Sequence, residues 1–106
     1  MSNMNQYAKL FNATLYRRSN PDKAKTLAAF QQRTANVHDA MVEVRAERDK
    51  HIEHAKHNYA HERLDAEING INAAYAEVLE TARKRVENDL DDVLAAKRAQ
   101  YKRSQA

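Results

Sequence analysis

The chain has no cysteine, and its 106 residues include a single glycine and a single proline. The lack of cysteine excludes disulfides, thiolate metal ligands and cysteine nucleophiles, and it is compatible with a reducing compartment. Because glycine and proline form most tight turns, their scarcity argues against a fold of many short strands. Ala, Glu, Lys, Arg and Gln, which favour helices, are frequent instead. The sequence therefore predicts an all-α protein.

Long apolar runs are also missing. No run approaches the roughly 18 residues that a membrane span needs, and the opening stretch MSNMNQYAKLF lacks the charged-then-apolar order of a secretory signal. The net charge of +3 is too mild to indicate nucleic acid by itself. We expect a single helical domain over residues 1–106 that is soluble, makes no membrane contact and is cytoplasmic, or virion-associated if its source is a virus.

A short helix is predicted at the start of the chain, because apolar residues recur there at three- and four-residue steps over residues 4–17. A stop signal follows. Ser19 or Asn20 can cap a new helix, and Pro21 suits a first helical turn because its missing N–H costs nothing there. We therefore expect a turn at Ser19–Pro21.

After this turn, the sequence predicts a long helix over residues 21–103. Asn69 and Gly70 form the only breaker pair in this stretch. The helix could therefore run through, kink or fold back near Asn69–Gly70, as a helical hairpin would.

Two apolar stripes follow this predicted helix at alternating steps of three and four residues. The first stripe consists of Leu27, Phe30, Val37, Met41 and Val44. The second stripe consists of Leu64, Ile68, Ile71, Tyr75, Val78, Ala82, Val86, Leu90 and Val93. Along one straight helix the two stripes would point roughly 170° apart, so they could not face the same neighbour. Either the chain bends back between them, or the helix offers opposite faces to two partners.

The second stripe predicts self-association. The short first helix can cover only part of the first stripe, which leaves the second stripe without a neighbour. An exposed apolar stripe on a helix is energetically unfavourable in water. We therefore expect a coiled-coil-like homo-oligomer, a dimer or trimer, formed through the second stripe.

Four of the five histidines fall within HIEHAKHNYAH, residues 51–61. His54, His57 and His61 share one helical face and lead into the second stripe. His57 and His61 are four residues apart, a spacing that lets two imidazoles on one helix reach one metal ion. Together with His54 on the same face, they are the candidate metal ligands. Stacked histidines could instead make association pH-sensitive. The simplest interpretation is a solvated polar junction between the two stripes.

Charges near the C-terminus come in blocks of one sign, which can set the register between paired helices or form a solvated face. We call the last positive block the basic end. It consists of Lys97, Arg98, Lys102 and Arg103. This block suits contact with an acidic protein surface or with phosphate. A second basic cluster, near the first turn, consists of Arg17, Arg18, Lys23 and Lys25.

No catalytic motif stands out, since the carboxylate pairs lie on an exposed helical stretch and a helical rod offers no concave pocket. We expect no enzymatic activity and no cofactor. The sequence favours a helical assembly or interaction protein that self-associates and docks a larger protein, as scaffolding and virion-associated phage proteins, adaptors and inhibitors do. The alternatives are a nucleic-acid-binding coiled coil that uses both basic clusters, and a metal- or pH-responsive helical protein that uses His51–His61.

Overall fold

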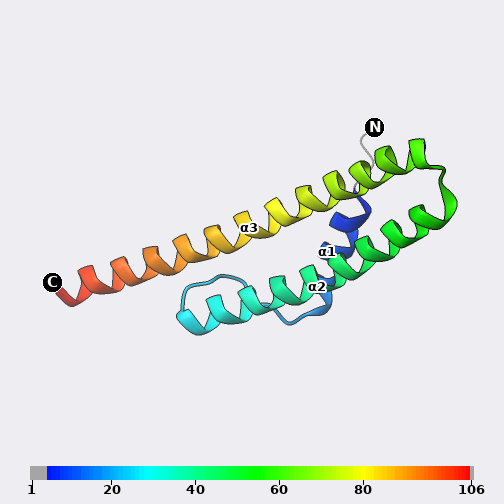
Figure 1. Cartoon of the computed structure of the whole chain (residues 1–106). Coiled ribbons are helices and arrows are strands. Elements are labelled where there is room, and N and C mark those ends of the chain that lie inside the picture. Colours follow the sequence, from blue (N-terminus) through cyan, green and yellow to red (C-terminus); the bar gives the residue numbers. More distant parts are fainter. Residues whose placement is uncertain (1–4, 106) are drawn as a thin grey trace.

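The computed structural model describes residues 5–105 and contains three helices in that range. They are α1 (Gln6–Arg17), α2 (Leu27–Asn58) and α3 (His61–Gln105). The two long helices form an antiparallel hairpin, and α1 lies against it (Figure 1). The molecule is a rod of 69 × 24 × 22 Å. The predicted all-α class, with a short first helix followed by long helices, is confirmed.

Helix α1 begins at an asparagine cap. The Asn5 side chain accepts a hydrogen bond from the Tyr7 backbone N–H at 2.8 Å, which satisfies a donor that the first helical turn leaves open. The Asn5 amide also donates to the Ala74 carbonyl of α3 at 2.7 Å. The same residue therefore starts α1 and fixes it to α3. The predicted start at residue 4 lies outside the described residues.

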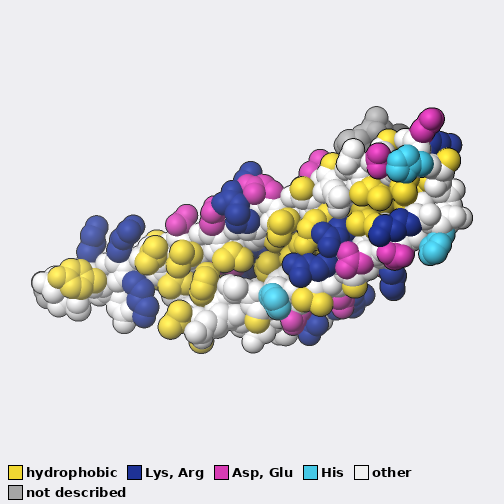
Figure 2. All heavy atoms as spheres, viewed as in Figure 1, with side chains coloured by type: hydrophobic (Ala, Val, Ile, Leu, Met, Phe, Trp, Pro, Cys, Tyr) yellow, Lys and Arg dark blue, Asp and Glu magenta, His cyan; other side chains and the backbone are white. Residues whose placement is uncertain are grey.

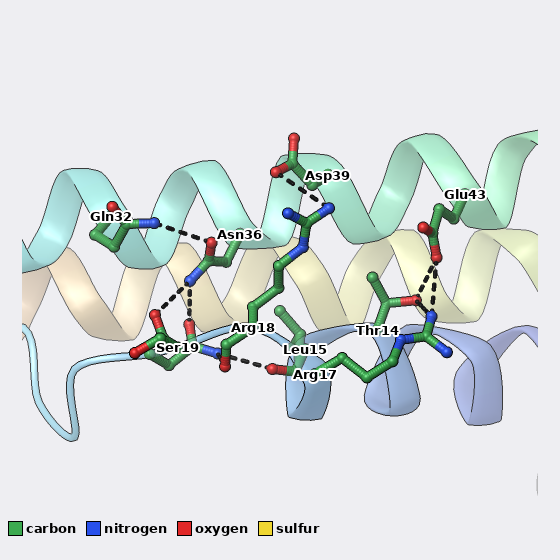
Figure 3. Close-up of polar contacts among 10 residues, drawn as sticks. Thr14, Leu15, Arg17, Arg18, Ser19, Gln32, Asn36, Asp39 and Glu43 are labelled. Carbon is green, nitrogen blue, oxygen red and sulfur yellow. Dashed lines mark hydrogen bonds and ion pairs between the residues drawn. The ribbon is translucent and has the colours of Figure 1, made fainter.

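The predicted helix start at Pro21 is wrong, because α2 begins at Leu27 and is capped by the Thr26 side chain. The two proposed cap residues are used in tertiary contacts instead: the Ser19 carbonyl accepts from the Asn36 side chain (Figure 3), and the Asn20 side chain bonds to both neighbouring helices. The Asn20 amide donates to the Leu15 carbonyl at the end of α1 at 2.9 Å, and its side-chain oxygen accepts from Asn36 of α2 at 2.7 Å. Residues 18–26 therefore form a loop that is fastened to the helices on both sides.

The chain folds back at Tyr59–Ala60 and not near Asn69–Gly70. The Tyr59 backbone is extended and ends α2, while the Ala60 carbonyl accepts the first hydrogen bonds of α3, from Arg63 and Leu64. Gly70 lies inside α3 with ordinary helical geometry, and its φ is not positive. A glycine costs a helix only about 1 kcal/mol. The apolar residues that keep their register across Gly70 outweigh that cost.

The turn makes the two apolar stripes face each other. Val37 and Val44 of the first stripe and Val78 and Ala82 of the second stripe are buried in one core, with Ala40 between them. Tyr7, Phe11 and Leu15 of α1 complete this core. Both stripes therefore pack mainly within one chain, as the predicted hairpin allowed, although Leu27 of the first stripe is 56% exposed at the start of α2.

A buried ion pair joins α2 to α3 beyond the apolar core. The Arg33 guanidinium donates to the Asp89 carboxylate at 2.9 Å, and the two side chains are only 12% and 5% exposed. Arg33 also donates to the Pro21 carbonyl at 2.7 Å. This arginine therefore connects the loop, α2 and α3. None of the three described helices combines the length and the apolar character needed to span a membrane.

Candidate interaction surface

The second stripe divides into a covered part and an uncovered part. Tyr75, Val78, Ala82 and Val93 are buried, and Ile71 and Val86 pack partly against the core. Leu64 and Ile68 are half-buried near the hairpin turn. Leu90, by contrast, is 45% exposed. Most of the predicted self-association surface is therefore occupied by α1 and α2 of the same chain.

The uncovered part lies on the C-terminal half of α3, whose far end extends past the beginning of α2 (Figure 1). Three large side chains are exposed there, and we call them the contact face: Leu90 (45%), Leu94 (43%) and Tyr101 (65%). Figure 2 shows apolar side chains gathered along this half of α3. At about 100° per residue, these three positions fall within about 40° of one another. They form one apolar strip on one side of the helix.

Two blocks of opposite charge lie along the part of α3 that carries the contact face, but Asp92 and Arg103 are on the far side of the helix, beside Ala96 and Ala99. Glu87, Asp91 and Asp92 form the acidic block, which precedes the basic end in the sequence. Leu94 and Tyr101, together with Lys97, Arg98 and Lys102, line a shallow hollow of about 320 Å³. The contact face is therefore an apolar strip with a depression and a charged border, which is the usual anatomy of a protein interface.

The structure brings half of the basic cluster near the first turn to the basic end of α3. Lys23 and Lys25 of the loop and Arg103 of α3 line a second hollow, of about 510 Å³. Arg17 and Arg18 do not join them, since they pair with Glu43 and Asp39 of α2 (Figure 3).

The histidine-rich segment lies at the hairpin turn. His54 and His57 are exposed in the last turns of α2, and His61 is exposed at the start of α3. Because α2 ends at Asn58, these three residues do not continue the second stripe along one helix as predicted. Within residues 5–105, no group of three or more His, Asp or Glu side chains is arranged to hold a metal ion. On the face shown in Figure 2, the histidine side chains lie apart from one another.

His51 has a different environment from its neighbours. Its ring lies 5.4 Å from the Tyr7 ring between centroids, and its Nδ1 accepts a hydrogen bond from the Tyr7 hydroxyl at 2.5 Å. Its Nε2 lies 3.2 Å from the Glu47 carboxylate. With a proton on Nε2, the imidazole satisfies both contacts. This chain of contacts ties α1 to α2 near the hairpin turn.

An open groove of about 650 Å³ lies beside this network, although the sequence predicted no concave pocket. Half of its lining residues belong to α3, and they include Gly70, where an added Cβ would meet nothing within 4 Å. Three of its polar lining residues, Asn5, Tyr7 and His51, are engaged in the contacts described above. They hold the helices together.

The Tyr7 hydroxyl makes the stability pH-dependent. Burial and the nearby Glu47 carboxylate raise the pKa of Tyr7 above its ordinary value, while Arg48 opposes this. The folded state therefore keeps Tyr7 protonated to a higher pH than the unfolded chain does. This contribution to stability is complete below about pH 10 and is lost as the pH rises through the folded-state pKa.

We expect Tyr7→Phe to lower the free energy of unfolding by about 1 kcal/mol at pH 8, because the bond to His51 is lost. The difference between wild type and variant should shrink above about pH 10. Urea unfolding of both proteins between pH 8 and pH 11 measures this difference in the free energy of unfolding. The effect of lysine titration is the same in both proteins and cancels when one value is subtracted from the other. A constant difference across this range would contradict the assignment.

Leu94 is the residue of the contact face that the sequence analysis missed. Leu94 was outside the second stripe because its neighbour Val93 fitted the three-and-four spacing. The structure turns Val93 inward and Leu94 outward. The adjacent pair was the available clue, since two consecutive large apolar residues form an arc too wide for one neighbouring helix to cover.

Comparison with known proteins finds no matching family model, no matching curated protein and no matching solved structure. The function must therefore be inferred from the residues and their geometry.

Proposed function

We propose that this protein is a non-enzymatic helical assembly protein of the scaffolding, virion-associated or adaptor kind. The α2–α3 hairpin, held together by α1, is the structural support, and the C-terminal half of α3 is the part that binds another protein. The single observation that supports this most strongly is the contact face. Leu90, Leu94 and Tyr101 are exposed, although Tyr75, Val78, Ala82 and Val93 of the second stripe are buried.

The position of the contact face agrees with this role. Exposed apolar strips with polar borders mark protein-binding sites, whereas single exposed apolar residues do not. The contact face belongs to a helix whose other side is anchored by Val93 and by the buried Arg33–Asp89 pair. A partner would therefore meet a preorganised helix, which keeps the entropic cost of binding low.

Photo-cross-linking in the cells that make the protein tests this proposal. Replacing Tyr101 by p-benzoylphenylalanine puts a reactive aromatic group on the contact face with little change in shape. Tyr16, which is 91% exposed on α1, is the matched control position. We expect covalent protein adducts from position 101 and few from position 16.

Two results would contradict the proposal. If position 101 formed no protein adduct, the contact face would have no partner. If positions 101 and 16 formed the same adducts in equal yield, the reaction would report general exposure rather than a binding surface.

A second candidate function is binding to nucleic acid. The observation in its favour is that Lys23 and Lys25 share a hollow with Arg103, so basic residues far apart in the sequence gather at one end. Against it, Arg17 and Arg18 are engaged with carboxylates. Retention on DNA that falls steeply with rising salt would favour this function, and no retention at low salt would dismiss it.

A further inference from the structure

The charge pattern of α3 is complementary to itself when reversed. The acidic block centres near residue 90 and the basic end near residue 100, so one sign follows the other along the helix. Two such helices attract each other when they run antiparallel, because each acidic block then lies opposite a basic end. A parallel arrangement would place like charges together.

We propose that the partner of the contact face is a second copy of this chain, which binds antiparallel along α3 with a two-fold axis between residues 94 and 95. This inference rests on the proposed function, because it names the occupant of the same surface. The overlap covers residues 84–105, and the two hairpins point away from each other at opposite ends.

The register follows from residues on one flank of the contact face. At about 100° per residue, Glu87, Asp91, Arg98 and Lys102 all lie between about 40° and 100° to one side of the centre of the contact face. A two-fold axis perpendicular to both helices keeps this flank on the same side in both copies. An axis between residues 94 and 95 sets Asp91 opposite Arg98. It also sets Glu87, which pairs with Arg83 of its own helix, opposite Lys102. Two-fold symmetry repeats both ion pairs.

The apolar contacts agree with the same axis. Leu94 of each copy lies next to the axis, where the hollow beside Leu94 and Tyr101 can receive a side chain of the second copy. Leu90 and Tyr101 lie on either side of it. Leu79 is also exposed, at 48%, but falls outside the overlap and is not needed.

The second copy does not compete with the loop of the first. Lys23 and Lys25 approach α3 near Ala96, Ala99 and Arg103. On the helical wheel these three α3 positions lie about 140° or more from the centre of the contact face. The loop and the second copy therefore occupy different sides of α3, and the hairpin stays intact in the dimer.

Single cysteines test the register, because the native chain has none. The variants are Leu94→Cys, Tyr101→Cys and Leu79→Cys in the full chain, each treated with a short bis-maleimide. In the proposed dimer the two copies of residue 94 are nearly level across helices about 8–10 Å apart. The two copies of residue 101 are offset by about 20 Å along the helix, and those of residue 79 by about 45 Å.

Charge exchange tests the orientation independently. Arg98→Glu with Lys102→Glu should weaken dimerisation at least tenfold, because both blocks become acidic. Adding Glu87→Lys and Asp91→Lys to the same chain should restore it, since the exchanged blocks are again complementary in antiparallel order. In a parallel dimer, the variant with all four substitutions would still place like charges together, as the wild-type chain would, so dimerisation would not be restored.

We expect sedimentation equilibrium of the purified protein to give a dimer, and Leu94→Cys to be cross-linked at least tenfold faster than the other two variants. Equal capture at all three positions would overturn the antiparallel register and leave the contact face as a binding surface. A monomer at several hundred micromolar, together with Tyr101 adducts to a different protein in cells, would overturn the second copy and keep the proposed function. A monomer without such adducts would overturn both.

Discussion

Phe11→Ala is expected to lower the free energy of unfolding by about 3–5 kcal/mol. Phe11 is 2% exposed and belongs to the core cluster that α1 forms with α2 and α3. Removing its ring leaves a cavity that three helices held by continuous contacts cannot close. Because a domain of this size has only about 5–15 kcal/mol of stability in total, the variant should be largely unfolded near body temperature.

Thermal and urea unfolding followed by circular dichroism measure this effect. Tyr16→Ala is the matched control, since Tyr16 lies on the same helix and is 91% exposed. It should change stability by no more than about 0.5 kcal/mol. If Phe11→Ala were equally mild, α1 would not be part of the cooperative core.

Asp89→Ala is expected to cost about 3–5 kcal/mol, although it removes only one small side chain. Asp89 neutralises Arg33 in the buried pair between α2 and α3. Arg85 lies beside them, and burial together with the Arg33 charge lowers the pKa of Arg85, while Asp89 opposes this. Without Asp89, two neighbouring guanidinium groups would remain in a poorly solvated place with no carboxylate between them.

The same reasoning predicts recovery when both charges are removed. A buried ion pair can often be replaced by apolar residues at little cost, whereas loss of one partner strands a charge. Arg33→Met combined with Asp89→Leu should therefore recover more than half of the stability lost in Asp89→Ala. Asp65→Ala, on an exposed side of α3 and outside the proposed overlap, is the control and should be nearly neutral. Additive losses in the double variant would contradict this account.

The sequence predicted the elements of this fold better than their connections. The three-and-four spacing of Tyr7, Phe11 and Leu15 located α1, and the same spacing identified both stripes. Periodicity indicates which side of a helix is apolar, and this side is the same whichever partner the helix packs against. It does not record whether the neighbour is another helix of the same chain or a second chain.

The position of the turn determines whether the two stripes pack against each other or against a second chain. No standard turn residue marks this position in the sequence. Tyr59 and Ala60 are neither glycine nor proline, and within residues 5–105 no residue has a positive φ. The stretch around them is polar and has no apolar stripe that would favour a continuous buried helix. Gly70 looked like a breaker, but its position on an open side of α3 made it harmless there.

Asn20 shows a second limit of local reasoning. Its residue type fits a helix cap, and the sequence assigned it to the helix that follows. In the structure its amide donates to the Leu15 carbonyl of the preceding helix, and its side-chain oxygen accepts from Asn36. Such contacts depend on the packing of α1 against α2, which no local pattern encodes.

Hydrogen–deuterium exchange at several protein concentrations tests most directly the claim that the second stripe is covered within one chain while the contact face binds a partner. We expect amides of residues 71–82 to be protected equally at low and high concentration. Amides of residues 90–103 should gain protection only at high concentration, when a second copy binds. Protection of residues 71–82 that rises with concentration would contradict the account, because the second stripe would then be an interface between chains.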